Sequence, residues 1–539
     1  MAKPVMSADD AVALLRDGDT LAIDGSGGGV AEPESLLQAL NRRFKETGHP
    51  RDLTIIHHAG IGGTRGCPPR GMVYLGEEGL CRRVIGGFWG RGPQLCRLAN
   101  ENKIEAYSFP QGVISQLYRE IAAGRPGLIT HIGLGTFVDP RLGGGKLNSL
   151  TQEDLVEVIT IAGREWLLYK SIPIDVAWIR GTTADEDGYL SMEQEAAQLN
   201  IQAVAQAARN SGGIVVAQVK RLAAAGSVPA RSVNVPGHMV DVLVLDEGQW
   251  QTYDGEYNPA FSGEVRVPLE GIAAMPFNER KVVARRAAAE LCPGMVLNLG
   301  VGMPDGVASV AAEEGVADMI TLTVEQGGHG GVPAGGNIFG SVSNPRAILD
   351  APNQFDFYDG GGLDLTCLGM AQTDSLGNVN VSRFNGSITG AGGFINISQN
   401  AKMVVFCATF TAGGLKEEIR DGKLRIVQEG KYLKFIKQVD EVTFSGEYAR
   451  KHGQRVIYVT ERAVMELKPE GITITEIAPG VDLKKDVLDL MEFQPLVSAD
   501  LKLMDARLFD PAPLGLAEAF KTRESFELRP RLRERMAGL

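Results

Sequence analysis

The sequence has little of what nucleic-acid-binding, membrane-spanning or secreted proteins need. Its 66 acidic residues outnumber its 54 basic residues, for a net charge of −12, which argues against nucleic acid as the main partner. No run of about 18 apolar residues predicts a membrane span. The first residues contain no apolar signal segment, and the six cysteines form no CxxC pair. We therefore expect a cytoplasmic protein with reduced thiols.

Several catalytic motifs are also missing. The sequence has no GxSxG, HExxH or GxxxxGK[ST] motif, and its seven histidines show no metal-ligand spacing, so we expect no metal site. The turn NLGVGMP (298–304) resembles the start of a dinucleotide-binding fingerprint, but Asp305 stands where the third glycine belongs. This departure makes a nicotinamide-dependent dehydrogenase a weak alternative.

Short apolar runs alternate with amphipathic stretches along the chain. The segments 33–46 and 304–315 have helical periodicity. Strand-like runs occupy 53–56, 213–219, 240–246, 402–408 and 455–460. This alternation predicts an α/β fold with largely parallel sheets.

The two halves of the chain repeat one pattern. Asp175 and Asp185 correspond to Asp364 and Asp374 at an offset of 189 residues, and each second aspartate is followed three residues later by glycine. A strand followed by a glycine turn also recurs, in 17–28 and 293–302. The pattern predicts two tandem homologous open α/β domains, at 1–250 and 275–539 with a linker at 251–274, and an active site between them.

The segment TLTVEQGGHGGVPAGGNIFG (321–340) is the most unusual in the chain. Glu325 follows a strand-like run and precedes a loop that is dense in glycine. A carboxylate at the end of a buried strand is costly unless it has partners or a shifted pKa. Glycines around it would let a slender ligand approach the carboxylate closely. Glu325 is therefore a candidate catalytic residue, although a glutamate after a strand can also simply cap a turn.

Two further glycine turns are candidate sources of backbone donors. The first, NLGVGMP, follows a strand and opens a helix, so its N–H groups would point toward an anion. The second, SITGAGGFINIS (387–398), is predicted to be a tight turn between strands, and a plain hairpin is an equal alternative.

Taken together, these motifs resemble the class I CoA-transferases, in the fused single-chain branch of propionate, acetate and short-chain acyl-CoA:3-ketoacid CoA-transferases. The resemblance covers nearly the whole chain. It rests on the segments 108–127, 132–148, 298–304, 321–336, 354–382, 390–398, 460–467 and 476–483.

The resemblance implies a reaction and a set of site residues. Glu325 would be the nucleophile that carries CoA as a glutamyl thioester, and Gln111 would help to hold the acyl carbonyl. The backbone that contacts CoA and stabilises oxyanions would lie at Gly300, Val301, Gly302, Gly392 and Gly393. The substrates would be acyl-CoA and short-chain carboxylic acids, with CoA as a substrate and no cofactor. The family also implies a homodimer or homotetramer.

Two other functions remain open at this stage. An acyl-CoA hydrolase on the same fold would release acid without an acceptor carboxylate. A ligand sensor would bind without turnover, although the intact glutamate and glycine turns argue against it. The chain departs from the family pattern at Gly328 and His329, so its acyl preference is not predicted.

Overall fold

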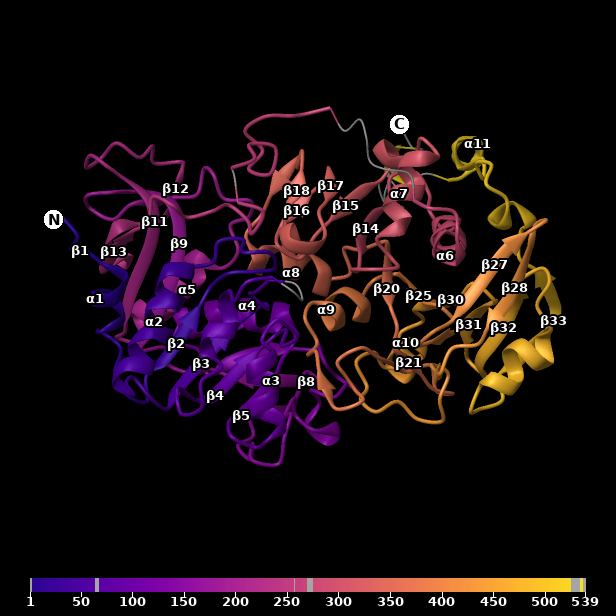
Figure 1. Ribbon diagram of the computed structural model, residues 1–539, viewed down its shortest axis with the longest axis horizontal. Helices are drawn as coiled ribbons and strands as arrows, with labels where there is room; N and C mark the ends of the chain where they lie inside the picture. Colours follow the sequence, from indigo (N-terminus) through magenta and orange to yellow (C-terminus); the bar gives the residue numbers. More distant parts are fainter. Residues whose placement is uncertain (1, 64–66, 256, 269–274, 525–533, 537–539) are drawn as a thin grey trace. The chain divides into compact units, whose positions relative to one another are not determined.

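The computed structural model describes residues 2–63, 67–255, 257–268, 275–524 and 534–536 (Figure 1). The described chain divides into two compact units, each made of three segments that are separate in the sequence. Unit 1 comprises 1–267, 324–357 and 385–396, and unit 2 comprises 268–323, 358–384 and 397–539. The predicted boundary between domains stays a prediction, and positions 256 and 269–274 of the predicted linker lie outside the described residues.

Unit 1 is built on a parallel sheet. Its main path runs β1-β13-β11-β9-β2-β3-β4-β5. These strands are β1 (Val5–Met6), β13 (Val242–Leu245), β11 (Ile214–Ala223), β9 (Val176–Asp185), β2 (Thr20–Ile23), β3 (Leu53–His57), β4 (Cys81–Gly86) and β5 (Glu105–Ser108). Every neighbouring pair on this path is parallel. The prediction of an α/β fold with parallel sheets is confirmed.

Both faces of this sheet are covered, because successive side chains of a strand point to opposite sides. In β2, Leu21 and Ile23 join one apolar cluster and Ala22 joins the other. Helices α1 (Ala8–Val12), α2 (Glu34–Thr47) and α3 (Pro93–Asn100) contribute to the first cluster, and α4 (Gln111–Ala122) and α5 (Ile201–Asn210) to the second. The carboxyl ends of the strands are left to loops, which is where ligands bind in such sheets.

Unit 2 repeats this plan. Its strands follow the order β15-β14-β20-β25-β30-β31-β32-β33. They are β15 (Thr321–Thr323), β14 (Val296–Leu299), β20 (Leu365–Gly369), β25 (Met403–Cys407), β30 (Arg455–Val459), β31 (Ala463–Lys468), β32 (Gly471–Ile477) and β33 (Leu496–Leu503). The first five are parallel, and β30, β31 and β32 are antiparallel neighbours. Helices α6 (Glu279–Ala288) and α7 (Gly306–Glu313) contribute to its core.

The repeat predicted from aspartate spacing recurs at the level of single hydrogen bonds. The Oδ1 atoms of Asp185 and Asp374 each accept N–H groups from the residues two and four positions later, at 2.9–3.2 Å. Gly188 and Gly377 then take left-handed φ values of +84° and +83°, which favour glycine. In the sheets, β2, β9, β11 and β13 correspond in order to β14, β20, β25 and β30.

Two local predictions need correction. The predicted helix at 304–315 begins later, at Gly306, because the Val307 N–H closes a turn onto the Pro304 carbonyl. The segment after the turn at 389–393 is not a strand but helix α9 (Phe394–Gln399). Its alternating isoleucines have strand propensity, yet Ile395 and Ile397 are both buried in the helix, so tertiary packing overrides local preference.

Candidate active site

Glu325 lies in a tight turn directly after β15. The Gly327 N–H donates to the Val324 carbonyl at 3.0 Å, and the Val324 N–H donates to the Gly328 carbonyl at 3.0 Å. Gly327 has a φ of +107°, and a Cβ added there would lie 1.9 Å from the Leu349 carbonyl oxygen. Only glycine fits this position, so the turn that presents Glu325 depends on it.

The Glu325 residue is half-buried. Burial raises its pKa to about 7, against the opposing effect of a hydrogen bond from its own backbone N–H. Among the described residues, no ion pair includes Glu325. A desolvated carboxylate without a counter-charge is costly for folding, and such groups concentrate at catalytic sites.

Gly393 forms the surface against which this carboxyl group packs. A Cβ added to Gly393 would lie 2.8 Å from Cγ and 2.9 Å from Oε1 of Glu325. The absence of a side chain at 393 is therefore what leaves room for the carboxylate. Gly393 belongs to the turn predicted as a source of backbone donors, and the structure brings this turn to Glu325 within unit 1.

Backbone hydrogen bonds hold the turn at 389–393 against loops that follow β4 and β5. The Gly392 N–H donates to the Gly87 carbonyl at 2.7 Å, and the Gln111 N–H donates to the Gly392 carbonyl at 2.8 Å. The Trp89 N–H donates to the Thr389 carbonyl at 2.7 Å. Because the Gly392 N–H is already bonded, its predicted role as an oxyanion donor would require that bond to give way.

Gln111 is the first residue of α4, and it is 4% exposed. Its side-chain Nε2 is buried and has no hydrogen-bond partner among the described residues. An unsatisfied buried amide costs roughly 1–3 kcal/mol, so its presence calls for an explanation. The backbone of Gln111 is bonded to the glycine turn at Gly392, and the expected contact of its side chain with an acyl carbonyl stays a prediction.

Gln326 and Ser26 extend this environment, and the sequence analysis did not identify them. The Gln326 Nε2 donates to the Ser26 Oγ at 3.0 Å, while the Gln326 Oε1 is buried without a partner among the described residues. Ser26 lies in the glycine turn after β2, where the Gly28 N–H donates to the Phe339 carbonyl at 2.9 Å. The signal for this turn was the glycine cluster at the carboxyl end of a parallel strand.

Phe88 is a third residue that the sequence analysis missed. A Cβ added at Gly392 would lie 3.4 Å from Cδ2 of Phe88, and one added at Gly90 would lie 3.0 Å from Cζ. Phe88 is half-buried. Its ring therefore stands next to the glycine turn that supports Glu325.

His329 is held by neighbours rather than solvated in a loop. It belongs to β16 (Gly328–His329), which pairs with β19 (Ala347–Ile348). Its Nε2 lies 2.5 Å from the Gln354 Oε1, and its ring centroid lies 6.0 Å from that of Phe357. These contacts fix the strand that follows the Glu325 turn.

The turn at Gly300, Val301 and Gly302 belongs to unit 2, and its predicted grouping with Glu325 stays a prediction. The Gly300 N–H donates to the Cys367 carbonyl at 2.8 Å, and the Gly302 N–H donates to the Asp305 carboxylate at 3.2 Å. The Val301 N–H has no acceptor among the described residues, and the residue is 63% exposed.

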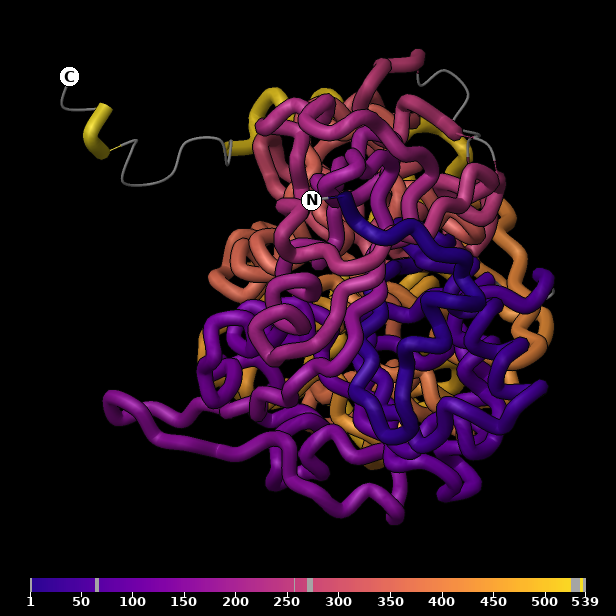
Figure 2. Tube along the Cα trace, turned by 90° about the vertical axis from the view of Figure 1, so that its left-hand side faces the viewer, coloured from indigo at the N-terminus to yellow at the C-terminus, as the bar shows by residue number. Residues whose placement is uncertain are grey.

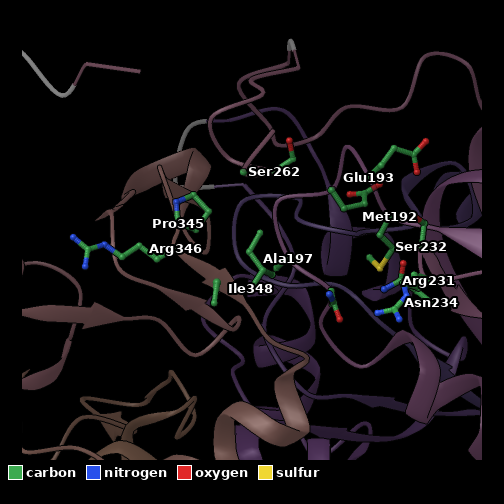
Figure 3. A pocket seen from close by; sticks show the side chains of 14 residues that line it. Met192, Glu193, Ala197, Arg231, Ser232, Asn234, Ser262, Pro345, Arg346 and Ile348 are labelled. Carbon is green, nitrogen blue, oxygen red and sulfur yellow. The ribbon is translucent and has the colours of Figure 1, made fainter. Parts of the chain in front are cut away.

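A cavity of about 410 Å³ lies in unit 1, and β19 forms part of its lining. On one side it is lined by 345–348, which includes the strand paired with His329. Figure 3 shows Met192, Arg231, Ser232 and Asn234 on the opposite side, and the Arg346 side chain extending away from them. Glu325 does not line this cavity.

No helix in the described part of the chain is long and apolar enough to cross a membrane.

Comparisons with known proteins show the family of the chain. A family model described as coenzyme A transferase matches residues 5–246. The chain is 48% identical over 513 residues to acetate CoA-transferase YdiF of Escherichia coli (strain K12), covering 95% of this chain and 96% of that protein. It is 49% identical over 519 residues to caffeate CoA-transferase of Acetobacterium woodii, covering 95% and 98%.

A solved structure is similar over the same length. The crystal structure of acyl-CoA transferase YdiF from E. coli O157:H7, in a thioester complex with CoA, matches with a TM-score of 0.90 at 48% identity. The match covers 95% of this chain and 97% of that chain.

Proposed function

The chain belongs to the coenzyme A transferase family, and we propose that it moves CoA from a short-chain acyl-CoA to a free carboxylic acid through a thioester on Glu325. One observation carries this proposal: a desolvated carboxylate with a pKa near 7 packs onto a bare glycine backbone at Gly393. A carboxylate in this setting is poised to act as a nucleophile, which is the role that covalent catalysis requires.

The proposed reaction has two symmetric halves. The Glu325 carboxylate attacks the acyl-CoA carbonyl, which breaks the thioester and gives a mixed acyl–glutamyl anhydride and CoA thiolate. The thiolate then attacks the glutamyl carbonyl, which releases the first acid as a carboxylate and leaves the Glu325–CoA thioester. A second carboxylate reverses both steps. Because one thioester and one carboxylate are present before and after, the reaction needs no ATP, metal or other cofactor.

The protein's contribution is binding and electrostatics. A carboxylate is a weak nucleophile, so the CoA body must supply binding energy that is used at the reacting carbon. Preorganised donors aimed at each oxyanion typically contribute about 3 kcal/mol apiece. We propose that the unpartnered Nε2 of Gln111 serves the acyl carbonyl, and that backbone at Gly393 and at 300–302 faces the reacting groups. Water must be kept out, because it would hydrolyse the anhydride and the thioester.

The acyl group is proposed to be short, such as acetyl or propionyl. A relative named for acetate supports this choice. A relative named for caffeate has similar identity to this chain, so pocket contacts such as Phe88 would decide the preference. Single contacts of this kind are worth about 1–3 kcal/mol. We further propose that the protein is a homodimer or homotetramer and that it is cytoplasmic. The six cysteines, none of which forms a disulfide, support the cytoplasmic location, because that compartment keeps thiols reduced.

The test is an exchange assay that distinguishes transfer from hydrolysis. The protein is incubated with acetyl-CoA or propionyl-CoA, with and without a second carboxylic acid, and the CoA esters are followed by mass spectrometry. Transfer predicts a new CoA ester only when the acceptor is present, with ping-pong kinetics. Release of free CoA at the same rate without an acceptor would identify a hydrolase and contradict the proposal.

A further inference from the structure

A small antiparallel sheet of unit 1 carries a surface that the proposed reaction does not use. The sheet consists of β6 (Gly127–Thr130), β8 (Arg164–Lys170) and β7 (Val156–Ile161), in that order. The hairpin of β7 and β8 projects from the rest of the unit at the lower left of Figure 2. The two faces of this sheet differ in what they contact within unit 1.

The inner face of this sheet is part of the core of unit 1. Val156, Leu167 and Tyr169 belong to a buried apolar cluster, and Leu128 and Val158 pack against that cluster. This face fixes the sheet in place.

The outer face is apolar too, and it is only partly covered: the His131 ring lies edge-on to Trp166, with the ring centroids 6.0 Å apart. Pairing places Ile159 opposite Trp166, Leu168 opposite Ile129, and Ile161 opposite Arg164. Directly opposed residues point to the same side of a sheet. Ile129 is 44% exposed and Ile161 is 45% exposed, while Ile159, Trp166 and Leu168 are half-buried. Contiguous apolar patches of this kind mark interaction surfaces.

Opposite charges flank this outer face at its two ends. Glu157 lies beside Leu168 at one end, and Arg164 lies beside Ile161 at the other. At about 3.4 Å per residue, the two ends are about 14 Å apart. The Glu157 carboxylate is 2.6 Å from the Lys170 Nζ. The Arg164 side chain has no ion pair or hydrogen bond within the described ranges.

We propose that this outer face (Ile129, Ile159, Ile161, Trp166 and Leu168) packs against the same face of a second copy of the chain. A two-fold axis near Ile159 and Trp166 would bring each Arg164 to the partner's Glu157 end, so the surface is complementary to itself. Such isologous contacts are the commonest kind in homo-oligomers. The inference rests on the homo-oligomeric state proposed above, and it adds the surface that forms the contact.

The size of the face sets what it can contribute. Three strands about 4.8 Å apart and five or six residues long cover on the order of 300 Å². A standard stable interface buries roughly 800 Å² on each partner. The outer face alone is smaller than such an interface, so the proposed contact has to extend beyond it, with substitutions in the apolar face expected to weaken association strongly.

The experiment measures mass in solution by sedimentation for the full chain and two charge variants. Arg164→Glu places a carboxylate at each end of the face, with Lys170 still paired to Glu157 at one of them, and Glu157→Arg makes both ends basic. For each variant alone, the dissociation constant of the oligomer should be at least about 10-fold higher than for the wild type, because like charges oppose each other across the two-fold axis. An equimolar mixture of the two variants should restore the association, since each unlike pair is re-formed. Leu496→Glu, at an exposed apolar residue of β33 (46% exposed), is the control and should leave the mass unchanged.

The outcomes separate the two proposals. A wild-type oligomer that both variants leave intact, or variants that dissociate but do not recover on mixing, would overturn this surface and keep the homo-oligomer. A monomeric wild type would overturn both, while the transfer reaction would stand on its own assay. Circular dichroism of each variant confirms that the chain remains folded, and the recovery on mixing could not occur with misfolded chains.

Discussion

Substituting Gly393 by alanine adds one carbon atom at the position where the proposed nucleophile packs. The new Cβ would lie 2.8 Å from Cγ and 2.9 Å from Oε1 of Glu325, whereas carbon contacts prefer about 3.5–4.0 Å. The flexible glutamate side chain must therefore move by roughly 0.7 Å or more. A misplacement of about 1 Å at a reacting group can cost about 100-fold in rate, which corresponds to about 2.7 kcal/mol.

We expect Gly393→Ala to lower kcat/KM for transfer about 100-fold while the melting temperature stays close to that of the wild type. Gly393 does not have a left-handed φ, so alanine adds no backbone strain there. Gly335→Ala is the matched control: Gly335 belongs to the glycine-rich segment that follows Glu325, has no left-handed φ, and an added Cβ would meet no atom within 4 Å. Wild-type turnover in Gly393→Ala, measured by CoA-ester exchange, would refute the placement of the nucleophile.

Three further predictions concern the same carboxyl group and its neighbour. Since the pKa of Glu325 is about 7 and attack requires the ionised form, kcat/KM should fall as pH drops through 7; a flat profile from pH 8 to 5.5 would count against this. Because burial raises that pKa above its ordinary value of 4.5, the free energy of unfolding of the wild type falls as pH rises from about 4.5 to 7. Glu325→Gln should therefore abolish transfer yet melt at a higher temperature than the wild type at pH 8, with the difference in melting temperature closing at pH 5. An equal difference at both pH values would contradict this. Gln111→Met should lower kcat/KM about 10-fold to 100-fold without lowering the melting temperature, because its Nε2 has no partner to lose; a large loss of stability would instead assign Gln111 a structural role.

The fold was predictable because its local signals agree with one another. Strand-like runs at 53–56, 213–219 and 402–408 became parallel strands, and the aspartate spacing marked a turn that both units repeat. The prediction of a strand after Gly393 was wrong, because β-branched residues favour strands on average, whereas here the burial of Ile395 and Ile397 stabilises a helix. The grouping of 324–357 and 385–396 with the first half depends on contacts between distant segments, which no local pattern encodes.

The site was predictable where backbone geometry demands a particular residue. Glu325 stood out because glycines surround it, and Gly327 and Gly393 are required by their close approach to Leu349 and Glu325. Ser26 and Phe88 were missed because a serine in a glycine turn and a lone phenylalanine carry no specific signal. Their importance comes from long-range contacts with Gln326 and with the turn at Gly392.

The measurement that tests the central claim most directly is peptide mass spectrometry of the protein after incubation with acyl-CoA alone. The account predicts that the peptide containing Glu325 gains the mass of CoA less one water, and that the adduct disappears when a carboxylic acid is added. Glu325→Gln, treated in the same way, should show no adduct. A CoA adduct on another residue, or turnover without any adduct on Glu325, would contradict the account.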